Sequence, residues 1–347
     1  MSLRFIFITA VILIVFTGCV NEIEFDVERT QGQIVVNGSI YDRPGPYQLQ
    51  LKITAIESAL PKPLTGAIVT LFSGDGNSEN YIELGDGIYE LPGDIITGKR
   101  GETYYIEILL SNGKVYQSIP ETIPSIHGRD SVFIEAEIIQ EPTATGGVRD
   151  VPMISVYADT EFPDATAPLY LHWSVYSKYS FIERASPSPL APPPNVCYVT
   201  TIPDPQTINI FSIANPGYQN IEKQLLVRKS IVQKEFFIRH YFNVVSKSVT
   251  ERRYQYWQRV DETINQSGTI FDSPPATPPG NLFNLNDDLE QVLGYFEAAA
   301  IDTSRAFVTR TDLPVSISNP CSGFNLPSSC DNCLLIENST LERPFYF

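Results

Sequence analysis

The chain has 347 residues, and its 40 acidic residues outnumber its 24 basic residues, which leaves a net charge of −16 at neutral pH. This excess of acid argues against binding to nucleic acid and against binding to anionic lipid through a basic face. A hydrophobic content of 43% is ample for a core, while 18 tyrosines, 19 phenylalanines and 27 prolines are typical of a protein rich in strands and loops. The length suggests two domains or one large β domain.

The N-terminus has the pattern of a secretory signal. Arg4 precedes an apolar run over residues 5–16, which is too short to cross a bilayer comfortably and has the length of a signal-peptide core. The sequence Phe-Thr-Gly-Cys that ends at Cys19 resembles a bacterial lipobox, in which the cysteine becomes lipid-modified and N-terminal. We therefore expect residues 1–18 to be a lipoprotein signal peptide and Cys19 to carry acyl chains, palmitate among them, that anchor the protein to a membrane. A plain secretory signal that ends near a cysteine by chance is the alternative.

Residues 19–32 are expected to form an acidic tether. Directly after Cys19 the chain carries four acidic residues and no basic one up to Glu28. An acidic run in this place resembles the signal that exports lipoproteins of Bacteroidota to the cell surface. The sequence therefore favours a protein displayed on the outer face of the outer membrane, with retention on the periplasmic face as the alternative.

The other four cysteines are Cys197, Cys321, Cys330 and Cys333. An even number of cysteines in an oxidising compartment predicts two disulfides, and three pairings are possible. Residues 186–194 are rich in proline and must form an exposed loop or edge, so we expect Cys197 to join this loop to the C-terminal tail. The spacing of Cys330 and Cys333 would also suit half of a zinc site or a redox-active pair. However, no second CxxC, no histidine close in sequence and no βαβ pattern accompanies it.

Residues 33–122 are predicted to form a small β-sandwich of the transthyretin or immunoglobulin type. Roughly seven short strands, separated by regular turns, fit into this length. Asp75, Asp86 and Asn112 are each followed by glycine, and these pairs predict tight hairpin turns because both residue types tolerate positive φ. Asp75 and Asp86 are interpreted as turn residues rather than calcium ligands, since no run of alternating acids surrounds them.

A larger β domain is predicted over residues 128–347, after a short linker bounded by Pro120 and Pro124. The strand expected at residues 169–176 alternates between two faces. One face carries Leu169, Leu171, Trp173 and Val175, and the other carries Tyr170, His172, Ser174 and Tyr176. The first face is predicted to be core. The second is predicted to pack on another element, with a ligand-binding surface as the alternative.

One long amphipathic helix is predicted at about residues 248–266. Ser248, with a glutamate three residues later, has the form of a capping box, and Gly268 stands where a helix end is expected. Tyr254 and Trp257 recur at helical spacing and begin an aromatic stripe. Because the surrounding sequence is predicted to be β, this stripe must lie on a sheet.

Five aromatic residues are the candidates for contact with a partner: Tyr254, Trp257, Tyr170, His172 and Tyr176. Exposed tyrosine and tryptophan contribute strongly to interfaces, which favours this choice. The competing interpretation is that most of these side chains belong to the core, because an aromatic stripe at helical spacing is usually a packing surface.

The sequence contains no catalytic motif that we can identify, neither the GxSxG of serine hydrolases nor the HExxH of zinc peptidases. A hydrolase acting on surface polymers would need a pair of carboxylates or a Ser–His–acid set. Candidate acids are Asp261, Glu262, Asp287 and Asp288, but acids are abundant in this chain. We therefore expect a protein that is not an enzyme and that uses no cofactor and no metal.

Short motifs follow one another along the mature chain: the lipobox that ends at Cys19 and residues 34–38, 45–47, 63–67, 254–257, 268–272, 280–281, 292–296, 330–333 and 343–346. In this order they resemble a family of Bacteroidota outer-membrane lipoproteins known only as a domain of unknown function, the DUF4249 type. Genes of this family usually stand beside genes for TonB-dependent receptors. No catalytic or ligand-binding residues are established for the family, so the resemblance implies a context rather than a chemistry.

The resemblance implies an accessory or binding lipoprotein that serves a TonB-dependent receptor system at the outer membrane. The expected partners are the membrane, through the lipid on Cys19, and a TonB-dependent barrel, while the ligand stays open. A structural, assembly or adhesion role in the outer membrane is the main alternative, and a surface-polymer hydrolase is a more remote one.

Overall fold

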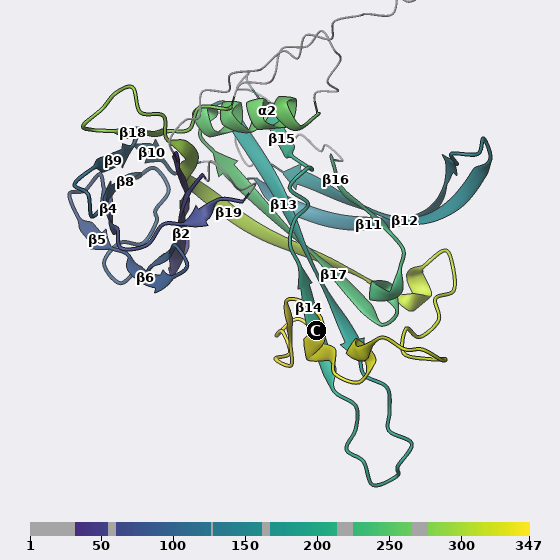
Figure 1. Cartoon of the computed structure of the whole chain (residues 1–347). Helices are drawn as coiled ribbons and strands as arrows, with labels where there is room; N and C mark the ends of the chain where they lie inside the picture. Colours follow the sequence, from purple (N-terminus) through teal and green to yellow (C-terminus); the bar gives the residue numbers. More distant parts are fainter. Residues whose placement is uncertain (1–31, 55–59, 126–127, 162–166, 214–224, 266–276) are drawn as a thin grey trace, which may run out of the picture.

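The computed structural model describes residues 32–54, 60–125, 128–161, 167–213, 225–265 and 277–347 (Figure 1). The predicted signal peptide, Cys19, the tether before Gly32 and the predicted helix end at Gly268 lie outside the described residues. Strands make up most of the regular structure that is described, and α2 (Glu251–Asn265) is the one α-helix in it. The predicted fold class, mostly β with a sandwich-like first part and one long helix, is confirmed. Among the described helices, none has the length and apolar character that crossing a bilayer requires.

The strands of residues 33–122 are β1 (Ile34–Tyr41), β2 (Tyr47–Ile53), β3 (Lys62–Pro63), β4 (Ile68–Ser73), β5 (Ser78–Asn80), β6 (Ile82–Gly85), β7 (Ile88–Leu91), β8 (Thr103–Leu109), β9 (Val115–Ser118) and β10 (Glu121–Thr122). They belong to two sheets, one ordered β1-β2-β7-β6 with β3 beside β2, the other ordered β9-β8-β4-β5 with β10 beside β8. Alternate side chains of β1 point inward, so Ile34, Val36 and Ile40 are buried in the shared core.

The three predicted hairpin turns are present, between β4 and β5, between β6 and β7, and between β8 and β9. Asp86 has a φ of 52° and Gly87 a φ of 70°, the left-handed conformation that a tight hairpin requires. Asp75 accepts hydrogen bonds from the backbone nitrogen of Asn77 at 3.1 Å and from its side-chain nitrogen at 2.9 Å. Asp75 therefore stabilises its own turn, as predicted.

Two strands from much later in the chain, β18 (Leu282–Asn284) and β19 (Leu293–Thr309), complete this small sandwich. β18 pairs with β9, and the first half of β19 runs parallel to β1. This pairing requires glycine at position 294, because its φ is 88° and a Cβ there would lie 1.9 Å from the carbonyl oxygen of Val36. Phe296 enters the same core. The predicted domain boundaries stay a prediction, but the sandwich uses strands from both ends of the described chain.

The remaining strands are β11 (Arg129–Pro142), β12 (Val148–Glu161), β13 (Leu169–Ile182), β14 (Val196–Thr201), β15 (Asn209–Ile213), β16 (Leu225–Ile231), β17 (Arg239–Val249) and β20 (Ser339–Thr340). The second half of β19 pairs antiparallel with β17, which pairs with β13. β19 is thus one continuous strand shared by the two parts of the protein (Figure 1).

A second core lies between the long strands and the separate three-stranded sheet of β11, β12 and β16. The face of β13 that was predicted to be core is buried there, from Leu169 to Val175. Ile154 and Val156 of β12 contribute from the opposite sheet. The short 3₁₀ helix η1 (Lys234–Phe236), which precedes β17, adds Phe236 to this core.

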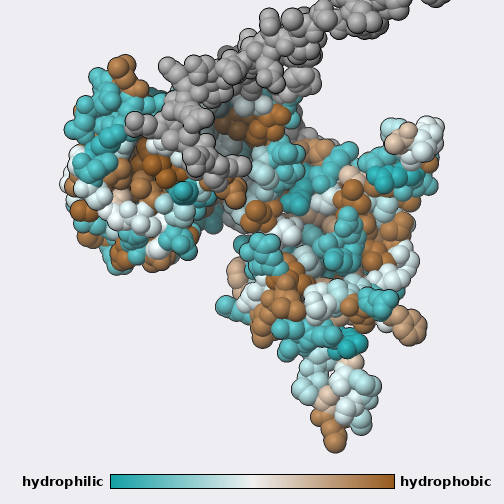
Figure 2. All heavy atoms as spheres, in the orientation of Figure 1, coloured by the Kyte–Doolittle hydropathy of each residue, from teal (hydrophilic) through white to brown (hydrophobic). Residues whose placement is uncertain are grey.

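Two extensions project from the body in Figure 1, the β11–β12 hairpin and the loop that joins β13 to β14. This loop contains the proline-rich residues 186–194, which are mostly exposed, as predicted. Leu190 within it is exposed, and Figure 2 shows hydrophobic surface at the projecting end.

The C-terminal tail contains three further 3₁₀ helices, η2 (Arg310–Asp312), η3 (Ser328–Cys330) and η4 (Cys333–Leu335). Cys197 is bonded to Cys333, and Cys321 is bonded to Cys330, so the prediction of two disulfides is confirmed and Cys197 does join the tail. These four cysteines are buried in a small core with Tyr179 of β13. Because Cys330 and Cys333 have different partners, the zinc and redox alternatives for their spacing are wrong.

The helix α2 begins later than predicted. Ser248 is buried in β17 and pairs with Ala300 of β19, so the predicted capping box is wrong. Thr250 caps the helix instead, because its Oγ1 accepts a hydrogen bond from the backbone nitrogen of Arg253 at 3.3 Å. Its carbonyl accepts the first helical hydrogen bond, from the nitrogen of Tyr254 at 3.0 Å. Strand β17 extends to Val249, so the next residue, Thr250, is the first that can cap the helix.

Replacing Thr250 with alanine is expected to lower the free energy of unfolding by about 1–2 kcal/mol. The Thr250 hydroxyl caps the helix at Arg253 and also donates to the buried carboxylate of Glu121, so alanine removes both interactions. Urea unfolding of the full chain measures the loss. Thr250→Ser keeps the hydroxyl and should stay within about 0.5 kcal/mol of the wild type. An equal loss in both variants would contradict the capping role.

Candidate ligand-binding site

A cavity of about 720 Å³, here called the junction cavity, lies where the small sandwich meets the long strands. Its walls come from five strands that are adjacent in one sheet, in the order β13-β17-β19-β1-β2, and from the first turns of α2 and the loop at residues 203–208. Figure 1 shows α2 above this junction. The cavity is within the range of roughly 300–1,000 Å³ that small-molecule sites usually have.

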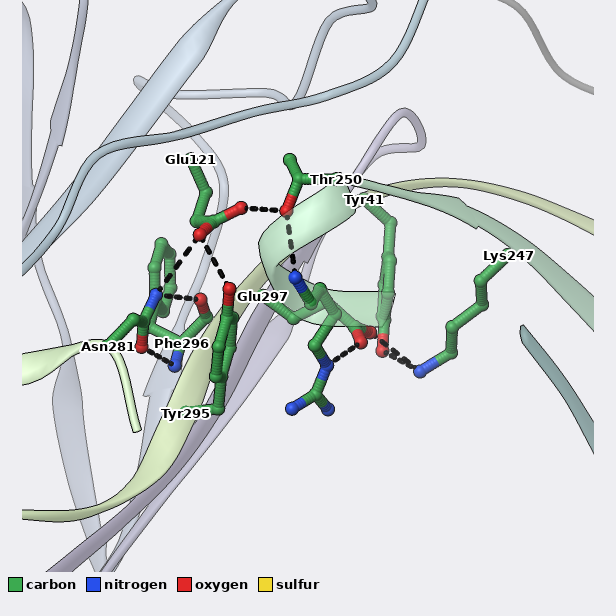
Figure 3. Close-up of polar contacts among 9 residues, drawn as sticks. Tyr41, Glu121, Lys247, Thr250, Asn281, Tyr295, Phe296 and Glu297 are labelled. Atoms are coloured by element: carbon green, nitrogen blue, oxygen red, sulfur yellow. Dashed lines mark hydrogen bonds and ion pairs between the residues drawn. The ribbon is translucent and has the colours of Figure 1, made fainter. Parts of the chain in front are cut away.

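Three charged residues, here called the cavity triad, line the junction cavity: the buried Glu297 of β19 and Arg253 of α2, and the partly buried Lys247 of β17. One carboxylate oxygen of Glu297 accepts a hydrogen bond from Nζ of Lys247 at 2.7 Å, and the other accepts from Nε of Arg253 at 2.6 Å. Lys247 also donates to the hydroxyl of Tyr41 at 3.1 Å, and Figure 3 shows these groups converging. The side chain of Glu297 is only 2% exposed, so the pairing is what makes its charge tolerable.

The pKa values at the triad follow from burial and from the neighbouring charges. Burial by itself raises the pKa of the Glu297 carboxyl, but Lys247 and Arg253 outweigh burial and hold that pKa well below its usual range. Burial likewise lowers the pKa of Lys247, while Glu297 and Tyr41 together raise it above its usual value. Glu297 and Lys247 are therefore both charged at neutral pH.

Aromatic rings surround the guanidinium of Arg253. Its central carbon lies 4.5 Å from the ring centre of Tyr295, 4.6 Å from that of Trp257 and 5.1 Å from that of Tyr256. A cation over a ring face is stabilised by the ring quadrupole, more so when water is excluded. The rings therefore hold the guanidinium in place beside the cavity.

Two polar atoms in the cavity wall have no protein partner. They are Nδ1 of His172 and Nε1 of Trp257, which are buried and make no hydrogen bond to any described residue. The two rings lie against each other, with centres 4.6 Å apart. Buried polar atoms nearly always have a hydrogen-bond partner, so these two atoms are among the few exceptions in the described residues.

A second polar cluster beside the cavity connects the small sandwich to α2. The carboxylate of Glu121, which is 1% exposed, accepts hydrogen bonds from the hydroxyl of Tyr295 at 2.7 Å and from Thr250, both drawn in Figure 3. It also accepts a hydrogen bond from Arg252 at 3.1 Å. Asn281 donates to it at 3.5 Å. Glu121 lies in the segment predicted to be a linker, where the structure instead contains the short strand β10, paired with β8.

Histidine burial predicts that the protein loses stability in mild acid. Burial, with Lys247 and Arg253 nearby, lowers the pKa of His172 to about 3, and burial lowers that of His240 to about 3 as well. The unfolded chain takes up these protons near pH 6.5 and the folded chain does not, so the stability present above pH 6.5 is lost as the pH falls towards 3. The expected loss is about 2 kcal/mol for each histidine between pH 7 and pH 5.

Urea unfolding at pH 7 and pH 5 measures this loss. The raised pKa of the buried Asp130 acts in the opposite direction and makes the net loss smaller. His172→Gln should reduce the difference between the two pH values. A variant whose stability changes with pH as much as that of the wild type would contradict a role for His172.

The structure places three of the five predicted contact residues in the wall of the junction cavity and the other two outside it. Tyr254 packs on Tyr170 with ring centres 5.4 Å apart, and Trp257 packs on His172. Tyr176, which is 40% exposed, lines the junction cavity with His172 and Trp257. The aromatic stripe of α2 thus lies on a sheet, as predicted, while contact with a partner stays a prediction.

Sequence reasoning missed the cavity triad. A signal existed for Glu297, which is a lone acid in the apolar run 292–300, since an unpaired charge in a buried strand is unfavourable. Its partners gave no such signal, because Lys247 and Arg253 are 50 and 44 residues away in the chain.

The candidate acids of the hydrolase alternative lie on separate segments. Asp261 and Glu262 are on α2, and Asp287 and Asp288 are exposed in the loop between β18 and β19. Asp261 accepts a hydrogen bond from the side chain of Asn265 at 2.7 Å, within its own helix. In the part of the chain that the structure describes, no group of three or more His, Cys, Asp or Glu side chains is placed to hold a metal ion.

The fold and the site define a mostly β protein in which two β units share one strand and a polar cavity lies beside the one described α-helix. The family model described as Domain of unknown function (DUF4249) matches residues 20–305, and the chain belongs to this family. The matched range includes the cavity triad and ends within β19. No curated protein and no solved structure matches the chain.

Proposed function

We propose that this protein is a lipid-anchored binding protein of the outer membrane that serves a TonB-dependent receptor as an accessory subunit. The lipobox-like sequence at Cys19 supports the anchor, and the acidic run after it supports display at the cell surface. Membership of the DUF4249 family supports the link to a receptor, because genes of this type usually stand beside receptor genes. The same resemblance supports an origin in Bacteroidota.

The junction cavity is the observation that carries the binding role. A general base needs an accessible lone pair and a pKa near the working pH. Both carboxylate oxygens of Glu297 are engaged by cations, and its pKa lies well below the usual range. His172 stays uncharged because burial holds its pKa at about 3. These groups suit the holding of a ligand better than the transfer of protons.

The tether between Cys19 and Gly32 is long enough for the β units to reach a neighbouring outer-membrane barrel. Cys19 and Gly32 are thirteen residues apart in the sequence. A chain of this length reaches at most about 45 Å when it is fully extended. The β units could therefore contact the outer loops of a receptor while the lipid stays in the membrane.

The proposal is tested by purification of the tagged, lipidated protein from outer membranes after mild crosslinking, with mass spectrometry of the captured proteins. We expect one TonB-dependent barrel in near-stoichiometric amount. Cys19→Ser, which cannot be lipidated, is the matched control and should lose the barrel. Capture of no barrel by the lipidated protein would contradict the accessory role.

A deletion strain separates this role from a structural or assembly role in the outer membrane. We expect normal receptor levels with loss of uptake of the receptor's cargo. General envelope defects with falling levels of many outer-membrane proteins would instead favour the assembly role.

A further inference from the structure

We propose that the junction cavity binds a small organic anion whose carboxylate is carried on a six-membered ring. Arg253, Lys247 and the indole N–H of Trp257 hold the carboxylate. This inference rests on the proposed binding function and names the chemistry of the ligand. A sugar acid and an aromatic acid share this chemistry, because each places a carboxylate on a ring with two faces.

The cavity triad has an unmatched positive charge. Lys247 and Arg253 together carry two positive charges, and Glu297 supplies one negative charge between them. All three side chains are largely withdrawn from water, so solvent screens the excess charge only weakly. One ligand carboxylate would balance the triad and would replace the missing counter-charge.

Asp204 is the other acid in the described wall of the cavity, and it does not supply that counter-charge. It lies exposed in the loop before β15. Its carboxylate accepts hydrogen bonds from the backbone nitrogen of Gln206 at 2.9 Å and from the hydroxyl of Thr207 at 3.2 Å. These bonds hold it within its own turn at the rim.

Arg253 and Lys247 have N–H groups to spare. Arg253 contacts Glu297 through Nε, and none of the hydrogen bonds among the described residues uses its two terminal nitrogens. Rings cover the faces of the guanidinium, and a guanidinium binds carboxylate through its edge. Lys247 donates to Glu297 and Tyr41, which leaves one of its three N–H groups.

Trp257 and His172 supply the second, independent observation. His172 is 6% exposed, and its Nδ1 is unpartnered beside the unpartnered Nε1 of Trp257. An indole N–H can only donate, so its natural partner is an acceptor such as a carboxylate oxygen. Trp257 lines the same cavity as Lys247 and Arg253, which carry the excess positive charge.

The rest of the cavity wall favours a ring with polar substituents. Tyr41 and Tyr176 present aromatic surface, and flat apolar faces stack on such rings. Asn37, Gln48 and Gln50 line the cavity from β1 and β2, and their amides can both donate and accept hydrogen bonds. The volume of about 720 Å³ leaves room for one ring and its substituents.

The test is isothermal titration calorimetry on the mature lipidated protein in detergent. D-glucuronate is compared with D-glucose, and benzoate is compared with benzamide, so that each pair differs in its carboxylate. We expect one of the two acids to bind at least about tenfold more tightly than its neutral counterpart, because hydrogen bonds to a charged group are the stronger ones. The pair that shows the difference identifies the ring as sugar or aromatic.

Trp257→Phe keeps an aromatic ring but removes the N–H together with the five-membered part of the indole. The lost packing and the weaker contact with the Arg253 guanidinium should lower the unfolding midpoint. In folded protein, well below that midpoint, the affinity for the acid should fall about tenfold while the affinity for its neutral counterpart stays the same, since the N–H would contact only the carboxylate. Tyr254→Phe is the matched control, since Tyr254 lies on the same helix outside the cavity wall, and it should bind as the wild type does.

The proposal is overturned if neither acid binds more tightly than its neutral counterpart, or if Trp257→Phe binds the acid as well as the wild type does. The result is independent of the barrel experiment. Capture of a barrel together with no difference between acid and neutral compound would retain the accessory role and remove the ligand chemistry. Binding of the acid without capture of a barrel would retain the ligand chemistry and remove the accessory role.

Discussion

Glu297→Gln is expected to cost about 3–5 kcal/mol of unfolding free energy, because it leaves buried cations without their counter-charge. Glutamine has a volume similar to that of glutamate, so the loss of unfolding free energy measures the effect of the charge rather than of packing. Lys247 and Arg253 would each lose a charged partner that lies within 2.7 Å in the wild type. Urea unfolding at pH 7 measures the difference, and a loss of cooperativity would show that the two β units come apart.

The matched control is Glu141→Gln in the exposed β11–β12 hairpin. Glu141 pairs with Arg149 at 2.8 Å, a distance close to those in the cavity triad, but the two side chains are 34% and 63% exposed. Such a pair contributes at most about 1 kcal/mol, since solvent screens it. If Glu297→Gln costs no more than Glu141→Gln, the triad does not stabilise the fold and the prediction is wrong.

Removal of the disulfide between Cys197 and Cys333 is expected to have an equally large effect. The bond closes a loop of 136 residues, and the chain-entropy relation gives about 5 kcal/mol for a loop of that length. The double variant Cys197→Ser with Cys333→Ser should therefore unfold at a much lower urea concentration. The exposed β13–β14 extension and the tail should become sensitive to protease, because this bond joins them.

The disulfide between Cys321 and Cys330 is the internal control. It closes a loop of 9 residues, for which the same relation gives about 2.5 kcal/mol. Its double serine variant should consequently lose about half as much stability. Equal losses in the two double variants, measured side by side in urea, would show that loop closure does not determine the contribution of these bonds.

Local patterns in the sequence predicted the parts of the fold that depend on neighbouring residues. Asp86 and Gly87 form a hairpin turn because few other residue pairs adopt positive φ so readily. The alternation along β13 predicted which of its faces is core. The capping box predicted at Ser248 was wrong because such a pattern considers only hydrogen bonds between neighbouring residues. Pairing with the distant Ala300 placed Ser248 in a strand instead.

The candidate site was predicted only in part. Trp257 of the predicted helix and His172 of the predicted strand were named as candidate contact residues, and both line the junction cavity. Glu297 was missed although its position in an apolar run was a signal. Glu121 was missed because prolines on both sides of it indicated a linker, and no local feature shows that a carboxylate will meet Tyr295.

The sequence by itself determined the strands, the tight turns, the aromatic helix and the even set of cysteines, because each depends on residues close together in the chain. Only the tertiary structure decided that β19 would run beside β1, from Val35 opposite Leu293 onward, and continue into the sheet of β17. That arrangement brings Glu297 between Lys247 and Arg253. A buried charge is stable only when oppositely charged partners lie within a few ångströms of it. These partners come together only when the whole chain has folded.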